Sequence, residues 1–287
     1  MEKRKDKEKQ RNGKFRKWIQ TAAGKVSILL ILISTIMLLV VLCDFTSKVG
    51  IDVKTANNIN NILVGLATNF IGIIVTVSFV QYFIDKQNKE EERKEEVEKI
   101  LRYNKIMKLL IARYTLFFQC VTSPIEKRTT IALSKDLMRE FSFSDMADLY
   151  KFSGVLTVEL LKPSIELFYE AEQALRNYMV EMIKNIDFKH NGKIESVLIE
   201  FIRQSQEMDV SGVIINNQKI FAGNKKQSEE VSQYIKDDLQ HKWVDRYMQG
   251  NLSANLMHPY VTLYLMLKIE GRILTEYQQL IDALLKS

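Results

Sequence analysis

Proline, glycine and cysteine are all scarce in this chain, which has 3 prolines, 11 glycines and 2 cysteines among 287 residues. All-β sandwiches and nucleotide-binding α/β folds need many tight turns, so the scarcity of turn-forming residues argues against both folds and favours helices. A hydrophobic fraction of 46% excludes a disordered protein. Two distant cysteines and three histidines are too few for a recognisable metal site.

The short motifs of common enzymes are absent as well. The chain has no Gly-x-x-x-x-Gly-Lys-Ser/Thr loop, no Gly-x-Gly-x-x-Gly, no Gly-x-Ser-x-Gly and no His-Glu-x-x-His. The sequence therefore offers no candidate catalytic, cofactor-binding or metal-ligating residue. We expect a protein that is not an enzyme and needs no cofactor.

The net charge of +6 comes from one end of the chain. Residues 1–25 hold ten Lys and Arg against three acids, a net charge of +7, which leaves −1 for all the rest. Binding to nucleic acid needs basic side chains spread over a folded face, so we do not expect it here. We expect a basic cytoplasmic tail at 1–25 whose Lys14, Arg16, Lys17 and Trp18 contact anionic lipid headgroups.

Two uncharged stretches are long enough to cross a bilayer. They cover residues 26–43 and the apolar part of 55–84, at 62–84. Lys and Arg are frequent before the first stretch and after the second, whereas the connection between them has only Lys48 and Lys54. The positive-inside rule therefore predicts a transmembrane hairpin over 26–84 in the cell (plasma/inner) membrane, with both termini in the cytoplasm.

Small and polar residues form a stripe along the second predicted span. Spacings of three and four place these residues on one helical face: Gly65, Thr68, Asn69, Gly72 and Thr76. Small residues let helix backbones approach closely, and an asparagine can form a hydrogen bond between helices in lipid. Two interpretations stay open: the stripe packs the two spans of one hairpin, or it is a seam between protomers or along a pore.

The second span is expected to continue into the cytoplasm as a stalk helix over 85–122, because no Gly or Pro occurs from Ile73 to Ser123. A helix over about 61–122 would be roughly 90 Å long. Within the stalk, spacings of three and four relate Val97, Ile100, Asn104, Met107, Ile111, Tyr114, Phe118 and Val121. This pattern fits either a helix that enters a bundle or a coiled coil in which Asn104 sets the oligomer number.

The remaining residues, 123–287, are predicted to form a cytoplasmic helical domain that begins after Pro124 ends the stalk. Helices are expected at about 134–140, 144–152, 163–186, 193–208, 228–249 and 259–286. Residues 212–221 fit either a small β-hairpin that turns at Asn216 and Asn217, or a loop. The expected fold class is thus an all-α membrane protein with a hairpin, a long continuous stalk helix and a helical bundle.

In outline, the hairpin and stalk resemble the small two-span membrane proteins of bacterial phage-defence and abortive-infection systems, which damage the inner membrane when triggered. This resemblance is architectural and implies a membrane-anchored, homo-oligomeric effector or scaffold whose cytoplasmic domain receives a cue. The alternative is a passive membrane tether or accessory subunit that docks a cytoplasmic partner protein.

Overall fold

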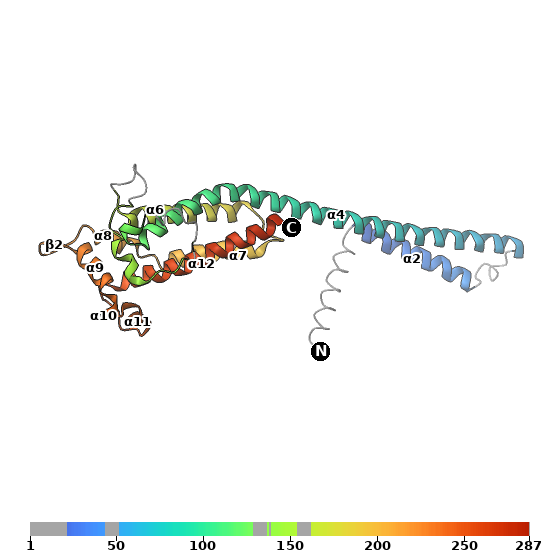
Figure 1. Ribbon diagram of the computed structural model, residues 1–287. Coiled ribbons are helices and arrows are strands. Elements are labelled where there is room, and N and C mark those ends of the chain that lie inside the picture. The colour runs from blue at the N-terminus through green and yellow to red at the C-terminus, as the bar shows by residue number, and fades with distance from the viewer. Residues whose placement is uncertain (1–21, 44–51, 129–136, 138, 154–161, 287) are drawn as a thin grey trace. The chain divides into compact units, whose positions relative to one another are not determined.

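The structure is a computed structural model, and it describes residues 22–43, 52–128, 137, 139–153 and 162–286. The described part is mostly helical (Figure 1). The chain divides into two compact units, Met1–Glu92 and Arg93–Ser287, which we call unit 1 and unit 2. The boundary falls within helix α4 (Val53–Val121), so the stalk expected at 85–122 does not form a unit of its own.

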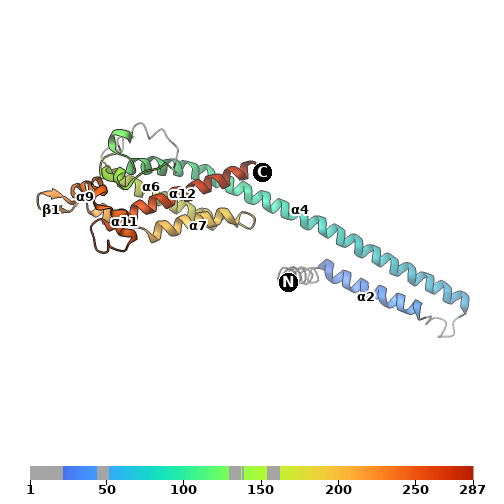
Figure 2. The ribbon, with the colours of Figure 1, turned by 60° about the horizontal axis from the view of Figure 1, so that its bottom comes forward.

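Unit 1 consists, in its described residues, of α2 (Ala22–Leu42) and the first part of α4. The two helices lie side by side (Figures 1 and 2). The amide of Thr55 donates to Asp52 Oδ2 over 3.1 Å, a hydrogen bond that uses one of the free N–H groups in the first turn of α4.

Unit 2 is built around four helices that run lengthwise beside one another: the second part of α4, α6 (Ser164–Asn185), α7 (Gly192–Glu207) and α12 (His258–Lys286) (Figure 2). Tyr114 of α4 lies at their centre. Its ring contacts those of Phe168 on α6 and Phe201 on α7, and its hydroxyl donates to Glu270 Oε2 on α12 over 2.6 Å. The buried faces of α6 and α12 carry the apolar stripes expected from the sequence, including Leu175 and Leu274.

Short elements close the end of this bundle where α4 stops. They are η1 (Ile125–Lys127), η2 (Phe143–Asp148), α8 (Ser211–Asn216), β1 (Phe221–Ala222), β2 (Lys225–Lys226), α9 (Gln227–Lys236), α10 (Asp238–His241) and α11 (Trp243–Met248). The helices expected at 163–186, 193–208 and 259–286 are present within one or two residues. The helix expected at 134–140 falls mostly outside the described residues.

The segment 212–221 differs from both alternatives that its sequence suggested. It begins as the helical turn of α8, because Ile214 is buried and its carbonyl accepts a hydrogen bond of 2.8 Å from the Tyr150 hydroxyl. Asn217, expected in the turn, instead donates through Nδ2 to the Tyr260 hydroxyl over 2.7 Å. A two-stranded antiparallel hairpin does form, but it lies later in the chain and turns at Gly223, whose φ of +67° suits a tight turn.

The helix expected over 228–249 is broken into α9, α10 and α11. Lys242 adopts a left-handed backbone conformation with a φ of 51°. Because the chain changes direction at Lys242, the buried side chain of Trp243 contacts α9, where its Nε1 donates to the Tyr234 carbonyl over 2.9 Å. The backbone amide of Trp243 donates to Asp238 Oδ1 over 3.0 Å. These two hydrogen bonds and the burial of the indole oppose a straight helix.

A buried arginine fastens the loops at the end of α4. Arg128 is 1% exposed and donates to the carbonyls of Ser123, Asp148 and Phe152 and to the hydroxyl of Ser164. Its planar guanidinium suits this arrangement because it presents several donors in fixed directions. The contacts tie the end of α4, the end of η2 and the start of α6 to one side chain.

Candidate functional site

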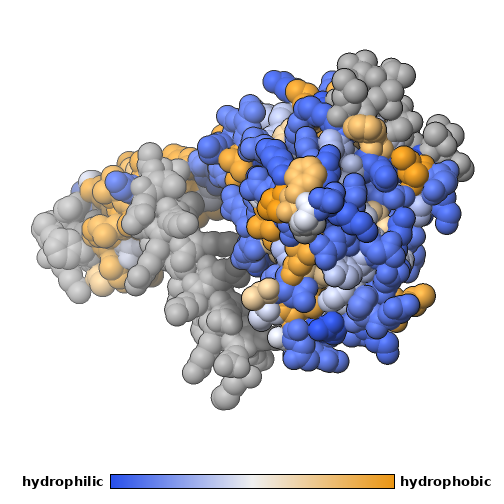
Figure 3. Space-filling view, turned by 90° about the vertical axis from the view of Figure 1, so that its left-hand side faces the viewer, coloured by the Kyte–Doolittle hydropathy of each residue, from blue (hydrophilic) through white to orange (hydrophobic). Residues whose placement is uncertain are grey.

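Among the described residues, two helices are long and apolar enough to cross a membrane, namely α2 over Gly24–Leu42 and α4. Only 11% of the apolar stretch of α2 and 6% of that of α4 are buried. Apolar residues that face outward include Leu29, Leu32, Val75 and Phe79. In Figure 3, by contrast, the face of unit 2 that is visible is mainly hydrophilic, with scattered hydrophobic residues.

The contact between α2 and α4 is formed by small side chains that the sequence reasoning did not single out. Ser27 and Ser34 of α2 are buried, as is Ala67 of α4, which has no exposed surface. Ser34 Oγ donates to the Ala67 carbonyl over 3.5 Å. The pair Ser27 and Ser34, seven residues apart within an apolar run, was the available signal for this face.

The predicted stripe lies away from that contact, and all five of its residues are exposed: Gly65, Thr68, Asn69, Gly72 and Thr76. The interpretation that the stripe packs the two helices of one hairpin is therefore wrong for the described structure. A Cβ atom added to Gly65 or Gly72 would meet no atom within 4 Å. The Thr68 and Thr76 hydroxyls donate to carbonyls one turn earlier in α4. Because Gly72 has no side chain, a shallow groove lies at this position, and Asn69 also lines it.

The predicted assembly face of the stalk is covered within the chain. Val97 is half-buried, and the other six residues are buried in unit 2: Ile100, Asn104, Met107, Ile111, Tyr114 and Phe118. Asn104 Oδ1 accepts a hydrogen bond of 3.1 Å from the Tyr277 hydroxyl on α12. The structure thus corrects the assignment of these residues to assembly between copies, because the width of the apolar face lets α6, α7 and α12 surround α4.

Glu96 marks the point where α4 joins the bundle. Residues 82–95 are all exposed, whereas Glu96 is 6% exposed. Its carboxylate accepts hydrogen bonds from the amides of His190 and Asn191, each 2.9 Å at the shortest, and from Asn191 Nδ2 at 2.9 Å. One acidic side chain of α4 thereby holds the turn between α6 and α7.

The four residues expected to contact lipid headgroups, Lys14, Arg16, Lys17 and Trp18, lie outside the described residues.

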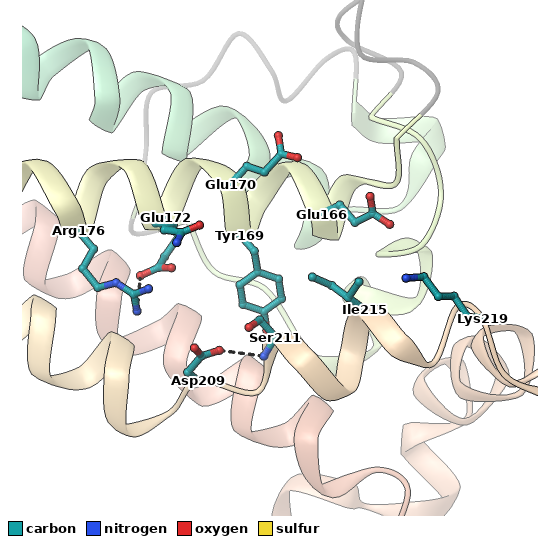
Figure 4. Close-up of a pocket in the computed structure, with 10 residues that line it drawn as sticks. Glu166, Tyr169, Glu170, Glu172, Arg176, Asp209, Ser211, Ile215 and Lys219 are labelled. Atoms are coloured by element: carbon teal, nitrogen blue, oxygen red, sulfur yellow. Dashed lines mark hydrogen bonds and ion pairs between the residues drawn. The ribbon is translucent and has the colours of Figure 1, made fainter.

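A polar cleft of about 420 Å³ lies between α6 and the segment that leads from α7 through α8 (Figure 4). Its lining residues are Glu166, Tyr169, Glu170, Glu172, Gln173 and Arg176 of α6, with Asp209, Ser211, Ile215 and Lys219 opposite. Arg176 Nη1 donates to Ser205 Oγ over 2.8 Å and lies 3.6 Å from Glu172 Oε1, which itself accepts from Ser205 Oγ. Asp209 Oδ1 accepts from the amide of Ser211 over 2.9 Å.

Tyr169 extends from α6 across this cleft toward Asp209 and Ser211 (Figure 4). Its side chain is 8% exposed, yet its hydroxyl has no hydrogen-bond partner within the described structure. Burial raises the pKa of Tyr169 well above its ordinary value, and the nearby carboxylates of Asp209, Glu270 and Glu172 raise it further. The Tyr169 hydroxyl is thus a neutral polar group that is buried but forms no hydrogen bond within the described structure.

Two buried carboxyl groups interact here: Glu172, which lines the cleft, and Glu270, which does not. Burial raises the pKa of Glu172, and the Ser205 hydroxyl and Arg176 oppose this rise. Glu270 has no exposed surface, and burial followed by the charge of Glu172 raises its pKa well above the ordinary value. Sequence reasoning missed this group, although Glu172 lies four residues from Phe168 and Glu270 three from Leu267, which places both acids on apolar helix faces.

Comparisons of the chain with protein-family models, with curated proteins and with solved structures found no match.

Proposed function

We propose that α2 and the first part of α4 cross the cytoplasmic membrane as a hairpin, with both chain ends in the cytoplasm. The outward apolar side chains of both helices support this location, since in water they would form an unusually large exposed apolar surface. The Lys and Arg residues on either side of the hairpin support the orientation.

We further propose that the chain is an oligomeric effector or scaffold whose unit 2 receives a cytoplasmic cue. The observation that carries this proposal is the exposed stripe of Gly65, Thr68, Asn69, Gly72 and Thr76. Nothing in the described structure covers the two glycines, so a helix of a second copy can approach the α4 backbone closely there. Asn69 supplies an amide that lipid would leave without a partner.

Since the apolar face of α4 beyond Glu96 is occupied within unit 2, we assign contacts between copies to the hairpin rather than to the stalk. One form of this function is a membrane-disrupting effector of phage defence. The architectural resemblance of a two-span hairpin joined to a helical cytoplasmic domain supports that form.

The mass of the detergent-solubilised full-length protein, measured by light scattering, tests the assembly. Asn69→Leu and Gly72→Leu place a bulky apolar side chain on the stripe, and Ile71→Leu is the matched control at an exposed position beside it. We expect a defined oligomer for the wild-type protein and for the control, and a smaller mass for both stripe variants, with insertion unchanged. A monomeric wild-type protein, or an oligomer that both stripe variants leave intact, would contradict the assignment.

The effector form has its own test in cells. Induced expression, with and without phage, is expected to change membrane potential, permeability or survival, and Asn69→Leu is expected to reduce that change. If expression alters none of these quantities, the protein is not a membrane-disrupting effector.

A passive tether is the second candidate, and the self-contained core of unit 2 favours it. In that case, residues 93–287 fused to an unrelated two-span anchor would retain the activity of the native protein. The effector proposal expects this fusion to be inactive because the α4 stripe is missing from it.

A further inference from the structure

The charges of the cleft between α6 and α8 favour a cationic occupant. Four acids and two bases line it, a formal excess of two negative charges. Some of these charges are already compensated, because Glu170 pairs with Lys162 at 2.5 Å and Arg176 lies against Glu172. Glu166, Asp209 and Lys219 form no ion pair within the described structure, which leaves a net negative charge at the open side of the cleft.

The Tyr169 hydroxyl supplies a second, independent indication that a ligand completes this site. Buried polar groups in folded proteins almost always have a hydrogen-bond partner, because a group that has left water without one is costly. This hydroxyl lies in the wall of the cleft, is shielded from bulk solvent and has no protein partner. The Tyr169 hydroxyl oxygen can accept a hydrogen bond from a ligand donor that also binds Asp209. Asp209 Oδ1 already accepts a hydrogen bond from the Ser211 amide.

A metal ion does not suit these residues. The described part of the chain holds no group of three or more His, Cys, Asp and Glu side chains placed to bind a metal. A nitrogen donor fits better, because ammonium and guanidinium groups form charge-assisted hydrogen bonds with carboxylates and also donate to a phenolic oxygen.

We propose that this cleft binds a small organic cation, an amine or a guanidine, whose charged nitrogen lies between Asp209 and the Tyr169 hydroxyl. Glu166 and Lys219, on the opposite side from Arg176 in Figure 4, contact the remainder of the ligand. The cleft volume of about 420 Å³ suits a molecule of this class. The inference does not depend on the proposed membrane function, since it concerns unit 2 and is tested by binding alone.

Calorimetric titration of the full-length protein in detergent with agmatine, putrescine and free arginine tests the site, with glutamate as the anionic probe. Tyr169→Phe removes only the hydroxyl, and Asp209→Asn removes one charge. Glu181→Gln, at an exposed position farther along α6, is the matched control for a lost carboxylate. Thermal unfolding of each variant without a probe reports whether it is folded.

At least one cationic probe is expected to bind the wild-type protein, and glutamate is not. We expect affinity to fall about tenfold in Tyr169→Phe, the effect of losing one hydrogen bond to a charged group, at least as much in Asp209→Asn, and not at all in Glu181→Gln. The proposal is overturned if none of the three cations binds at millimolar concentration, if glutamate binds instead, or if the folded Tyr169→Phe and Asp209→Asn variants bind as the wild type does.

Discussion

Replacing Arg128 with methionine tests whether one side chain holds the loops at the end of α4. Methionine keeps much of the length of arginine but removes the donors that serve the carbonyls of Ser123, Asp148 and Phe152 and the hydroxyl of Ser164. Ser123, Asp148 and Ser164 are buried, whereas Phe152 is 50% exposed, so the variant leaves the acceptors of the three buried residues without this donor.

The size of the effect follows from two opposing contributions. Each hydrogen bond from a charged donor contributes about 1.5–3 kcal/mol, and five such bonds are lost, counting the 3.5 Å bond from Arg128 Nη1 to the Lys151 carbonyl. Against this loss, the variant no longer buries a charge, and burial of the guanidinium is unfavourable enough to lower the pKa of Arg128. Removal of one partner from a buried charged network typically costs about 3–5 kcal/mol, which we expect here. That is a large part of the stability of an ordinary domain.

Urea unfolding of the full-length protein in detergent, followed by far-ultraviolet circular dichroism, measures this loss. Arg102→Met is the matched control, because Arg102 forms an exposed pair with Glu98 at 3.2 Å and such pairs contribute well under about 1 kcal/mol. The reasoning is refuted if Arg128→Met destabilises the protein by less than about 1 kcal/mol or no more than the control does.

Three further substitutions test the interior of unit 2. Asn104→Leu removes the buried hydrogen bond with Tyr277 and is expected to cost about 1–2 kcal/mol in urea unfolding while leaving the oligomer mass in light scattering unchanged. A changed oligomer mass would instead support the interpretation that Asn104 takes part in assembly between copies. Gly271→Ala brings a Cβ atom to 2.8 Å from the Leu137 carbonyl oxygen, so we expect a loss of about 1–3 kcal/mol in the same assay, and an unchanged midpoint would contradict this close approach. Glu270→Gln tests the raised pKa of Glu270. The folded chain keeps a proton that the unfolded chain releases above the ordinary pKa of 4.5, so wild-type stability falls as the pH rises from there toward the folded-state pKa. The stability of the variant relative to the wild type should therefore be greater at about pH 8 than at about pH 4, and an equal difference at both would refute the assignment.

The long helices could be predicted from the sequence because each depends on a local pattern. Uncharged stretches marked α2 and the start of α4, and the absence of Gly and Pro from Ile73 to Ser123 indicated that α4 continues. The stop at Pro124 was equally local, since proline disfavours a helical conformation in the residue before it. The broken helix at Lys242 was not predicted, because tertiary contacts of Trp243 outweighed a helical pattern.

The sites were harder to predict because they depend on which faces meet. Two faces of α4 in unit 1 carry small residues. The sequence drew attention to the face with two glycines and an asparagine, whereas α2 contacts the face that holds Ala67. The cleft brings Tyr169 together with Asp209, which lies forty positions later in the sequence, after the end of α7. The periodicity of a single helix cannot predict that residues from two different segments meet. An acidic residue on an otherwise apolar helix face, such as Glu172, does indicate that this face includes a polar site.

The distribution of contacts along α4 limits where the two proposed functions, contact between copies and recognition of a cue, can reside. From Glu96 onward the inner face of α4 is filled by unit 2, and a second copy could use it only by displacing α6, α7 or α12 from a core that includes Tyr114 and Asn104. Such a core is closely packed, so that displacement would expose much apolar surface to water. The stripe at Asn69 needs no displacement, because nothing described covers it. Contact between copies at the hairpin and recognition of a cue in unit 2 are therefore both compatible with one folded state of each unit. A coiled coil formed by the stalk would instead require unit 2 to change its fold.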